Sequence, residues 1–402
     1  MPQDRPSAAT PVLSVIGTGY LGATHAACMA EVGFTVIGVD VDPDKVAALS
    51  AGVVPFFEPD LDDLLKRNID AGRLRFTTSF GEAGEAADVH FICVGTPQQP
   101  GAYAADMSQV FGSISSLAPH VSSTDVIVGK STVPVGTADE IVDQLKNTAA
   151  SGVDVVWNPE FLREGFAVQD TLKPDRLVVG VASERAEQVM RTVYAPLIAD
   201  GVPFLVTDFP TAELVKVAAN SFLATKISFI NAMAEVCEAA GADVTMLATA
   251  IGHDPRIGNR FLSAGLGFGG GCLPKDIRAF MARAGELGAE EALTFLREVD
   301  QINLRRREHT VDLARKTLGG DLRGKVVTML GATFKPDSDD VRDSPALDVA
   351  VAIYNAGAHV RVHDPKGLPN AERVYPHMDY RSDLDDAATG SDLLILGTEW
   401  LE

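Results

Sequence analysis

One stretch near the amino terminus constrains the fold more than any other. Residues 12–17, VLSVIG, form an apolar run of strand length that leads into GTGYLG, so Gly17, Gly19 and Gly22 have the G-x-G-x-x-G spacing. A helix is predicted up to Gly33, and a second strand, TVIGVD, ends at Asp40. In this order of elements the glycines bring a helix N-terminus close to a pyrophosphate, and the terminal acid accepts a ribose hydroxyl. The stretch predicts a dinucleotide site, for NAD rather than NADP because Asp40 would repel a 2′-phosphate.

The strands that follow share one feature, since polar residues stand where they end. ADVHFICVGTP ends at Thr96 and Pro97, DVIVGKSTVPVGT ends near Thr132, and VDVVWNPEFLREG ends at Glu160. In an open parallel sheet this edge forms the ligand crevice. Each threonine alone could equally be a turn residue or a helix cap. We favour the crevice because three such strand ends occur in succession.

Beyond residue 208 the apolar period changes from strand to helix. Residues 211–241 lack Gly and Pro before Gly241 and predict one long helix, and residues 291–320 predict another. Lys216 and Asn220 lie four residues apart on the first helix and therefore share a face. They are either a solvated pair or, as the apolar neighbours of Lys216 indicate, a partnered functional pair. The arginines at 305–307 of the second helix are predicted to form a solvated face.

From Lys325 the outline of the first domain begins again. KVVTMLGATFK, a helix from Pro345, HVRVHDP and SDLLILGTEW repeat it, so this part is interpreted as a second mononucleotide-binding half. Its first turn lacks the three glycines and carries Phe334 and Lys335, which suit a nucleotide base and a phosphate. We therefore expect an α/β chain with a Rossmann-like NAD domain (1–208), a central helical domain (209–318) and a second Rossmann-like nucleotide domain (319–402).

The loop GLGFGGGCLPKD, residues 265–276, is the clearest candidate for chemistry. Its five glycines let the backbone pass close to a ligand and leave Cys272 accessible. Pro274 and the apolar spacing after it predict a helix that begins beside the cysteine. The helix N-terminus, with Lys275, favours a thiolate there, so we interpret Cys272 as a nucleophile. The alternative is a small buried side chain, which most lone cysteines are.

Composition excludes several classes of function. The 402 residues carry a formal net charge of −21, which disfavours nucleic acid and anionic membranes as partners. No apolar run approaches the length of a membrane-spanning helix, and the four cysteines have no metal-ligand spacing, so no metal is expected. The amino-terminal segment lacks the features of a signal peptide, which predicts a cytoplasmic enzyme.

Taken in order, the motifs GTGYLG, VGTP, STVPVGT, NPEFLREG, GFGGGCLPKD, FKPDSDDVRDSPA and TEW resemble the UDP-glucose/GDP-mannose dehydrogenases over nearly the whole chain. The resemblance implies a four-electron oxidation of UDP-glucose to UDP-glucuronate with two NAD+, through a cysteine thiohemiacetal and a thioester that water cleaves. By the same resemblance Cys272 is the nucleophile, while Lys216 and Asn220 stabilise the oxyanion. Asp276 orients water or acts as a base, and Glu160 acts in hydrolysis of the thioester, with Thr132 included in the catalytic set.

The resemblance also implies the binding residues of a homodimeric enzyme. For NAD it indicates Gly17, Gly19, Tyr20, Leu21, Gly22, Asp40, Lys45, Thr96, Pro97, Thr132, Glu164, Lys275 and Arg342. For the nucleotide sugar it indicates Glu160, Phe161, Leu162, Arg163, Glu164, Lys216, Asn220, Phe261, Leu262, Ser263, Ala264, Gly265, Phe268, Gly269, Phe334 and Lys335. Arg256 resembles an arginine that reaches the substrate of the neighbouring subunit.

Three alternatives to this function stay open. Leu273 after the cysteine is shared with GDP-mannose dehydrogenases, so GDP-mannose or UDP-N-acetylmannosamine could replace UDP-glucose. A two-electron hydroxyacid-type dehydrogenase would have no use for Cys272, and a nucleotide-sugar sensor would need only binding groups. The chain ends at Glu402, directly after TEW, where the family usually continues, which indicates either a truncated chain or an incomplete nucleotide domain.

Overall fold

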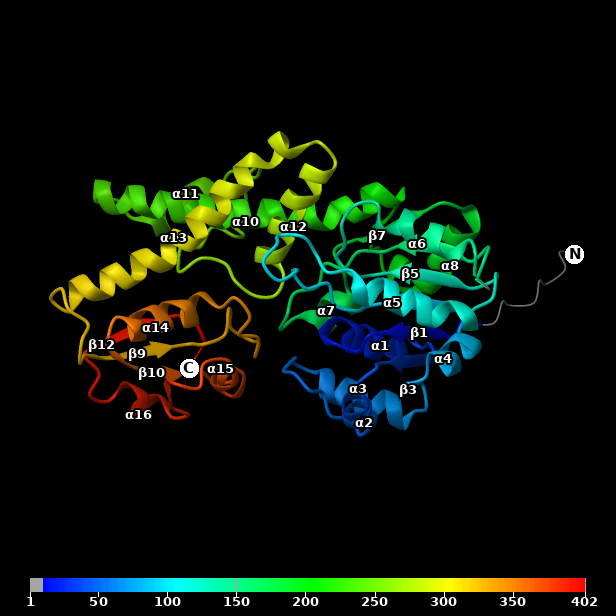
Figure 1. Cartoon of the computed structure of the whole chain (residues 1–402), viewed down its shortest axis with the longest axis horizontal. Coiled ribbons are helices and arrows are strands. Elements are labelled where there is room, and N and C mark those ends of the chain that lie inside the picture. Colours follow the sequence, from blue (N-terminus) through cyan, green and yellow to red (C-terminus); the bar gives the residue numbers. More distant parts are fainter. Residues whose placement is uncertain (1–9, 149, 402) are drawn as a thin grey trace, which may run out of the picture. The chain divides into compact units, whose positions relative to one another are not determined.

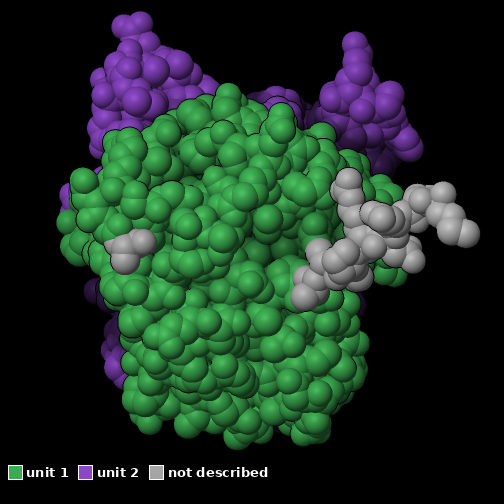
Figure 2. Space-filling model, turned by 90° about the vertical axis from the view of Figure 1, so that its right-hand side faces the viewer, with its two compact units in different colours: residues 1–100, 105–216 green, residues 101–104, 217–402 purple. Residues whose placement is uncertain are grey.

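The computed structural model describes residues 10–148 and 150–401. The predictions drawn from residues 1–9 and from the chain's end at Glu402 fall outside the described residues and stay predictions. The chain forms two compact units, which Figure 2 colours separately. The first comprises Met1–Pro100 with Ala105–Lys216, and the second comprises Gly101–Ala104 with Val217–Glu402.

The first unit is built on an eight-stranded sheet with the order β3-β2-β1-β4-β5-β6-β7-β8, within the described residues. Its neighbouring strands are parallel except for the β6–β7 pair. The strands are β1 (Leu13–Ile16), β2 (Val36–Val39), β3 (Leu74–Thr77), β4 (Val89–Ile92), β5 (Val126–Gly129), β6 (Asp154–Trp157), β7 (Leu177–Val181) and β8 (Phe204–Thr207). The order 3-2-1-4-5-6 is that of a doubly wound dinucleotide-binding fold, whose crevice lies where the order reverses, between β1 and β4.

Helices cover both faces of this sheet, which explains the near-continuous apolar runs in its strands. On β1, Leu13 and Val15 pack into one core with α1, α3 and α8, whereas Ile16 packs into the other with α4, α5 and α6. The helices are α1 (Tyr20–Val32), α2 (Pro43–Ser50), α3 (Leu61–Asp70), α4 (Phe80–Ala86), α5 (Ser108–Leu117), α6 (Thr137–Leu145), α7 (Ala167–Leu172), α8 (Glu184–Val193) and α9 (Ala195–Ala199), with a 3₁₀ turn at Ala118–His120. Figure 1 labels most of these elements.

Long helices dominate the start of the second unit. The helix α10 (Phe209–Ala240) begins in the first unit and continues into the second, where α11 (Val244–Gly252), α12 (Leu273–Glu286), a 3₁₀ turn (Glu290–Leu293) and α13 (Thr294–Thr317) follow. A small core joins α10, α12 and α13 through Ala224, Ile277 and Leu296. Figure 1 shows α13 crossing α10 before it reaches the second sheet.

The second sheet has four parallel strands in the order β11-β10-β9-β12, within the described residues. They are β9 (Val326–Leu330), β10 (His359–His363), β11 (Asp379–Tyr380) and β12 (Leu393–Leu396), and they alternate with α14 (Pro345–Asn355), α15 (Leu368–Val374) and α16 (Leu384–Ala388). The last turns of α13 pack into the core of this sheet through Val311 and Ala314. The predicted class is confirmed: a Rossmann-like first part, a helical middle and a second Rossmann-like part.

One prediction about the long helices is wrong. Arg306 and Arg307 are not part of a solvated face but are buried, and only Arg305 is exposed. Arg307 forms ion pairs with Asp343 and Asp348, so its guanidinium is paired with carboxylates of the same unit and does not face solvent. Among the described residues no helix combines the length and the apolar character needed to cross a membrane.

Candidate active site

The turn after β1 has the geometry of a phosphate cradle. Gly17 has φ +87°, and a Cβ on Gly22 would lie 1.8 Å from the carbonyl oxygen of Gly17, so both positions require glycine. Gly19 is the N-cap of α1, and a Cβ there would meet no atom within 4 Å. Gly19 has no side chain to cap the first amides of α1, and uncapped amides at a helix N-terminus are the arrangement that binds a pyrophosphate.

Asp40 lies directly after β2, as predicted, and its carboxylate is held by several donors. Its Oδ2 accepts hydrogen bonds from the backbone N–H and hydroxyl of Thr18 at 2.9 and 3.0 Å and from Lys45 Nζ at 2.9 Å. Burial alone raises the pKa of Asp40, but Lys45 and the backbone N–H groups of Thr18 and Asp42 bring it below its usual value. Asp40 is thus ionised at neutral pH, and Thr18 and Lys45 fix its carboxylate at the strand end where a ribose would lie.

The ends of β4 and β5 are joined through their threonines. Thr96 Oγ1 donates to the carbonyl oxygen of Thr132 at 2.8 Å, and Ser131 Oγ donates to the carbonyl of Val94 at 2.6 Å. These bonds bring two of the predicted cofactor-binding strand ends together. Pro97 is exposed beside Thr96.

Glu160, three residues after β6, is enclosed by cations and amides. Its Oε2 lies 3.1 Å from Lys130 Nζ, and its Oε1 accepts the backbone N–H groups of Phe161 and Leu162 at 2.5 and 2.7 Å. Lys216 Nζ stands 5.6 Å from the centre of the Phe161 ring. Lys216 is 9% exposed and Asn220 is also buried, so the interpretation of these two as a solvated pair is wrong.

The segment after Glu160 is tied to the glycine turn. Tyr20 donates its hydroxyl to Glu58, and the same carboxylate accepts the backbone N–H groups of Gly165 and Ala167 at 2.7 and 2.6 Å. Arg163 forms an ion pair with Asp170. Tyr20, predicted to contact the cofactor, is thus engaged through its hydroxyl in holding this loop.

In the second unit Cys272 lies at the start of a helix, as the sequence predicts. Cys272 is the N-cap of α12 and is exposed, whereas Cys28, Cys93 and Cys237 are buried, so the interpretation of Cys272 as a small buried side chain is wrong. One turn later Asp276 is 2% exposed and accepts Asn220 Nδ2 at 2.7 Å and Lys275 Nζ at 2.6 Å. Three of the predicted residues are therefore joined within hydrogen-bonding distance at the start of α12.

Several glycines of the cysteine loop pack closely against other parts of the protein, and Gly269 most tightly because its neighbour is backbone. A Cβ on Gly269 would lie 2.2 Å from the carbonyl oxygen of Asp343, one on Gly270 would lie 2.8 Å from the Phe334 ring, and one on Gly271 would lie 2.4 Å from the Arg342 guanidinium. The loop also donates from Gly270 N to the Arg342 carbonyl at 3.0 Å. Phe334 and Arg342 are thus brought against the loop that carries Cys272.

Two residues that sequence reasoning missed hold this loop from α13. Asn303 Oδ1 accepts the N–H of Phe268 at 2.7 Å, and its Nδ2 donates to the carbonyl of Phe268 at 2.9 Å. Arg307 Nη2 donates to the same carbonyl at 3.1 Å. A buried Asn and a buried Arg on one helix face are signals of such a clamp, but the sequence alone does not show that they are buried.

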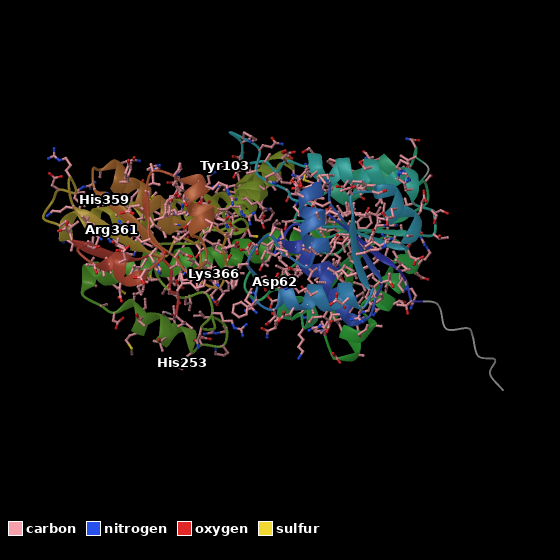
Figure 3. All side chains as sticks on the ribbon, turned by 90° about the horizontal axis from the view of Figure 1, so that it is seen from below. Asp62, Tyr103, His253, His359, Arg361 and Lys366 are labelled. Carbon is pink, nitrogen blue, oxygen red and sulfur yellow. The ribbon has the colours of Figure 1, made fainter. Side chains whose placement is uncertain are left out.

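Other predicted binding residues lie along the second unit without forming one cluster. Arg256 is 87% exposed and is paired with Asp254. The side chains of Leu262 and Phe268 are buried, whereas Phe261 and Ser263 are exposed. Lys335 Nζ lies 5.7 Å from the centre of the Phe334 ring. Tyr103 belongs to the short segment Gly101–Ala104 of this unit and is exposed (Figure 3).

Comparison with known proteins identifies the relatives of this chain. Family models of the UDP-glucose/GDP-mannose dehydrogenase family match the chain as the NAD binding domain over residues 12–198, the central domain over residues 210–305 and the UDP binding domain over residues 328–402. The chain is 43% identical over 393 residues to UDP-glucose 6-dehydrogenase of Rhizobium meliloti (strain 1021), covering 97% of this chain and 90% of the relative. It is 40% identical over 394 residues to UDP-glucose 6-dehydrogenase TuaD of Bacillus subtilis (strain 168), covering 97% and 84%.

Solved structures agree with the sequence relatives. A UDP-glucose dehydrogenase from the hyperthermophilic archaeon Pyrobaculum islandicum superposes with a TM-score of 0.93 at 39% identity, covering 99% of this chain and 92% of the other. A UDP-D-ManNAc dehydrogenase from Pyrococcus horikoshii superposes with a TM-score of 0.84 at 26% identity, covering 96% and 88%. Because the family models span nearly the whole chain and relatives above 30% identity cover almost all of it, the chain belongs to the UDP-glucose/GDP-mannose dehydrogenase family.

Proposed function

We propose that this chain is an NAD-dependent UDP-glucose 6-dehydrogenase that oxidises UDP-glucose to UDP-glucuronate. The observation that carries the proposal is the exposed thiol of Cys272 at the N-terminus of α12, one turn from the buried Asn220–Asp276 pair. A two-electron dehydrogenase has no need for a thiol, whereas a four-electron enzyme needs one. The aldehyde formed by the first oxidation must become tetrahedral before a second hydride can leave.

The overall reaction removes two hydrides from the same sugar carbon and adds one water. NAD+ held by the glycine turn and Asp40 would supply the hydride acceptor for each oxidation. Between the two oxidations the Cys272 sulfur bonds to the aldehyde carbon, which gives a thiohemiacetal and then, after loss of the second hydride, a thioester. Water then forms a bond to the thioester carbon, the carbon–sulfur bond breaks, and the thiol is regenerated.

The remaining polar residues divide the work by their chemistry. An ammonium group and an amide donor suit an oxyanion, so we assign that task to Lys216 and Asn220. Asn220 is already fixed by Asp276, which gives Asp276 a role in orienting the amide and the water near it. Glu160 is the acceptor for the hydrolytic water. Its burial raises its pKa, but the charges of Lys130 and Lys216 lower the pKa below the usual value, so it acts as a carboxylate.

Each cofactor or substrate assignment is supported by features of a single unit. In the first unit, the glycine turn, the N-terminus of α1 without a side-chain cap and the ionised Asp40 fit NAD. In the second unit, Phe334 packs on the cysteine loop and Lys335 Nζ lies near its ring, and the two side chains suit the base and a phosphate of the nucleotide. The relatives named UDP-glucose 6-dehydrogenase share 39 to 43% of their residues with this chain, against 26% for the UDP-D-ManNAc dehydrogenase, which favours UDP-glucose as substrate.

We also propose that the enzyme works as a homodimer in the cytoplasm. Arg256 supports the dimer, because its side chain is largely exposed and is held by Asp254 alone among the interactions described for it. An arginine presented in this way can reach the substrate of a second copy. Sedimentation of the full chain should give twice the monomer mass, and a monomer that is fully active would contradict the proposal.

The function is tested by counting NADH. UDP-glucose, GDP-mannose and UDP-N-acetylmannosamine are each supplied in limiting amount, and we expect two NADH per UDP-glucose with little turnover of the others. Cys272→Ala should abolish this turnover while leaving calorimetric binding of UDP-glucose intact. Cys237→Ala, the same change at a buried cysteine of α10, should keep it. One NADH per sugar, or normal turnover of Cys272→Ala, would contradict the four-electron function.

A further inference from the structure

A buried lysine contacts Glu160, and the function above uses only its charge. Lys130 follows β5 directly and is 4% exposed. Lysine is seldom buried to this extent unless it is paired, because removing an ammonium group from water is costly. The groups that pair with Lys130 therefore indicate its role.

The partners fix the ammonium group on both sides. Lys130 Nζ lies 3.1 Å from Glu160 Oε2 and 3.1 Å from Asn158 Oδ1. Asn158 is fully engaged in turn, because the same oxygen accepts the Tyr194 hydroxyl at 2.6 Å and Nδ2 donates to the Val178 carbonyl at 2.8 Å. The two donors to its oxygen leave the amide only one orientation. Asn158 thus holds Lys130, and Lys130 holds Glu160.

The carboxylate of Glu160 has little acceptor capacity left. An ionised carboxylate offers about four lone-pair positions. Oε1 uses two of them for the N–H groups of Phe161 and Leu162, and Oε2 uses one for Lys130. A single position on Oε2 remains for a further donor. A hydroxyl or a water molecule is the kind of donor that fits there.

The charged and titratable groups around Glu160 keep it ionised. The cations are Lys130 from the end of β5 and Lys216 from α10, and the neutral titratable neighbours are Tyr194, Cys93 and Cys28. Burial raises the pKa of Tyr194 and raises that of Cys93 to about 12, so neither adds a negative charge at neutral pH. Burial lowers the pKa of Lys130, but Glu160 outweighs this and the pKa is raised, so the pair is an ammonium and a carboxylate.

We propose that Lys130 is a positioning residue of the proposed hydrolysis step: it fixes Oε2 of Glu160 so that the remaining lone pair accepts a hydrogen from the water that cleaves the thioester. The inference rests on the proposed function. In this step the water oxygen bonds to the thioester carbon and the carbon–sulfur bond breaks. One water proton returns to the Cys272 sulfur, and the other leaves when the product acid ionises.

The first test separates hydrolysis from the oxidations. When the full-length enzyme is mixed rapidly with UDP-glucose and NAD+, Lys130→Met should still release two NADH per enzyme in the first turnover. Its steady-state rate should then fall roughly 10²-fold, the scale of losing a positioned proton acceptor. Intact-protein mass spectrometry should find the sugar acyl group retained on Cys272. A first turnover slowed by the same factor as the steady state would overturn the inference.

The second test is a pH profile, which a merely structural lysine would not move. Loss of the ammonium group raises the pKa of Glu160, so the acid limb of the steady-state rate in Lys130→Met should move up by about 1 to 3 pH units. Tyr194→Phe is the matched control, because it removes one hydrogen bond from the same buried cluster and leaves the cation in place. An unmoved limb in Lys130→Met, or an equal shift in Tyr194→Phe, would contradict the inference.

A double variant covers the case in which Lys130→Met fails to fold because Glu160 is left as an unpaired buried charge. Lys130→Met with Glu160→Gln removes both charges, and if Lys130 acts through Glu160 it should turn over as fast as Glu160→Gln alone. A further loss of rate in the double variant would show a separate role for Lys130 and overturn the inference. If the wild type does not form two NADH from UDP-glucose, the proposed function is overturned as well. If the wild type is active and Lys130→Met has the same steady-state rate, the inference alone is overturned.

Discussion

The clamp that Asn303 places on the cysteine loop makes a prediction whose size follows from the structure. Asn303 is 1% exposed, and it satisfies both the N–H and the carbonyl of Phe268. In Asn303→Leu the carbonyl keeps a second donor, Arg307 Nη2 at 3.1 Å, so little is lost there. The buried N–H has no second acceptor among the described contacts. An unsatisfied buried amide costs about 1 to 3 kcal/mol.

That cost falls on the loop rather than on the whole chain. The loop lies between Phe268 and the Cys272 N-cap, and its neighbours Gly269 to Gly271 pack closely against residues 334–345. We therefore expect Asn303→Leu to open this segment locally. Since each 1.4 kcal/mol is a factor of ten, amide hydrogen exchange of residues 265–272 should accelerate by about 5- to 150-fold. The rate at which iodoacetamide alkylates Cys272 should also differ from that of the wild type, because the loop no longer holds the thiol in one position.

Hydrogen exchange followed by mass spectrometry measures this segment directly. Gln301→Leu provides the control, because Gln301 is exposed on the same helix and its amide is replaced by the same side chain. The control should leave exchange of residues 265–272 unchanged, since exposed substitutions cost within about 0.5 kcal/mol. Unchanged exchange in Asn303→Leu, or equal acceleration in both variants, would refute the reasoning that the two Phe268 bonds hold the loop.

Two further predictions concern the first unit. Gly22→Ala should abolish NAD binding in calorimetry, because its Cβ would lie 1.8 Å from the Gly17 carbonyl oxygen. The control is Gly112→Ala in α5, where a Cβ meets no atom within 4 Å, and this variant should bind NAD normally. Normal binding by Gly22→Ala would contradict the turn geometry. Asp125 predicts how the stability of the fold depends on pH. Burial raises the pKa of Asp125, but His90 and Ser122 bring the pKa below its usual value. The ionised carboxylate therefore stabilises the fold above about pH 4, and this stabilisation is lost as the pH falls further. The melting temperature of Asp125→Asn should lie below that of the wild type at pH 6 and approach it near pH 3, and a constant difference would contradict this sign.

The parts of the fold that could be predicted from the sequence are those set by neighbours in the chain. The strand, glycine turn, helix and acid of residues 12–40 depend on local spacing, and so does the helix start beside Cys272. Arg307 could not be predicted, because its partners Asp343 and Asp348 come from 36 and 41 residues further along the chain. A run of three arginines on a helix gives no sign of which one faces a carboxylate on a later loop.

The candidate site shows the same division between local and distant causes. The types of Cys272, Asn220 and Asp276 pointed to chemistry, but their grouping depends on α10 meeting α12, with 56 residues between Asn220 and Asp276. The sequence predicts that the glycines of the cysteine loop allow close approach of a ligand, and the structure gives a second reason for them. Three of them face Asp343, Phe334 and Arg342, residues that no local pattern connects with the loop.

The second Rossmann-like part keeps an acid at the end of its second strand, and the surroundings of that acid can be compared with those of Asp40. Asp364 follows β10 as Asp40 follows β2, and its carboxylate too is held by protein donors. Its Oδ2 accepts Ala332 N, Thr333 N, Thr333 Oγ1 and Trp400 Nε1, and its Oδ1 accepts the N–H groups of Lys366 and Gly367. Lys366 is labelled in Figure 3. Asp40 accepts four protein donors, from Thr18, Lys45 and Asp42, so Asp364 is held by two more donors than Asp40 is.

The turn after β9 also differs from the glycine turn after β1. After Gly17 the helix α1 begins at Tyr20, whereas after Gly331 the helix α14 begins only at Pro345. The intervening loop carries Phe334 and the Arg342–Asp343 backbone that packs on the cysteine loop. In place of a short glycine turn that leads to a helix N-terminus, this part has a long loop that packs on the segment carrying Cys272. The second part thus has the strand-and-acid frame of the first, but its first turn contacts the loop of Cys272 in place of forming a glycine cradle, so we expect nucleotide binding there to depend on side chains such as Phe334 and Lys335.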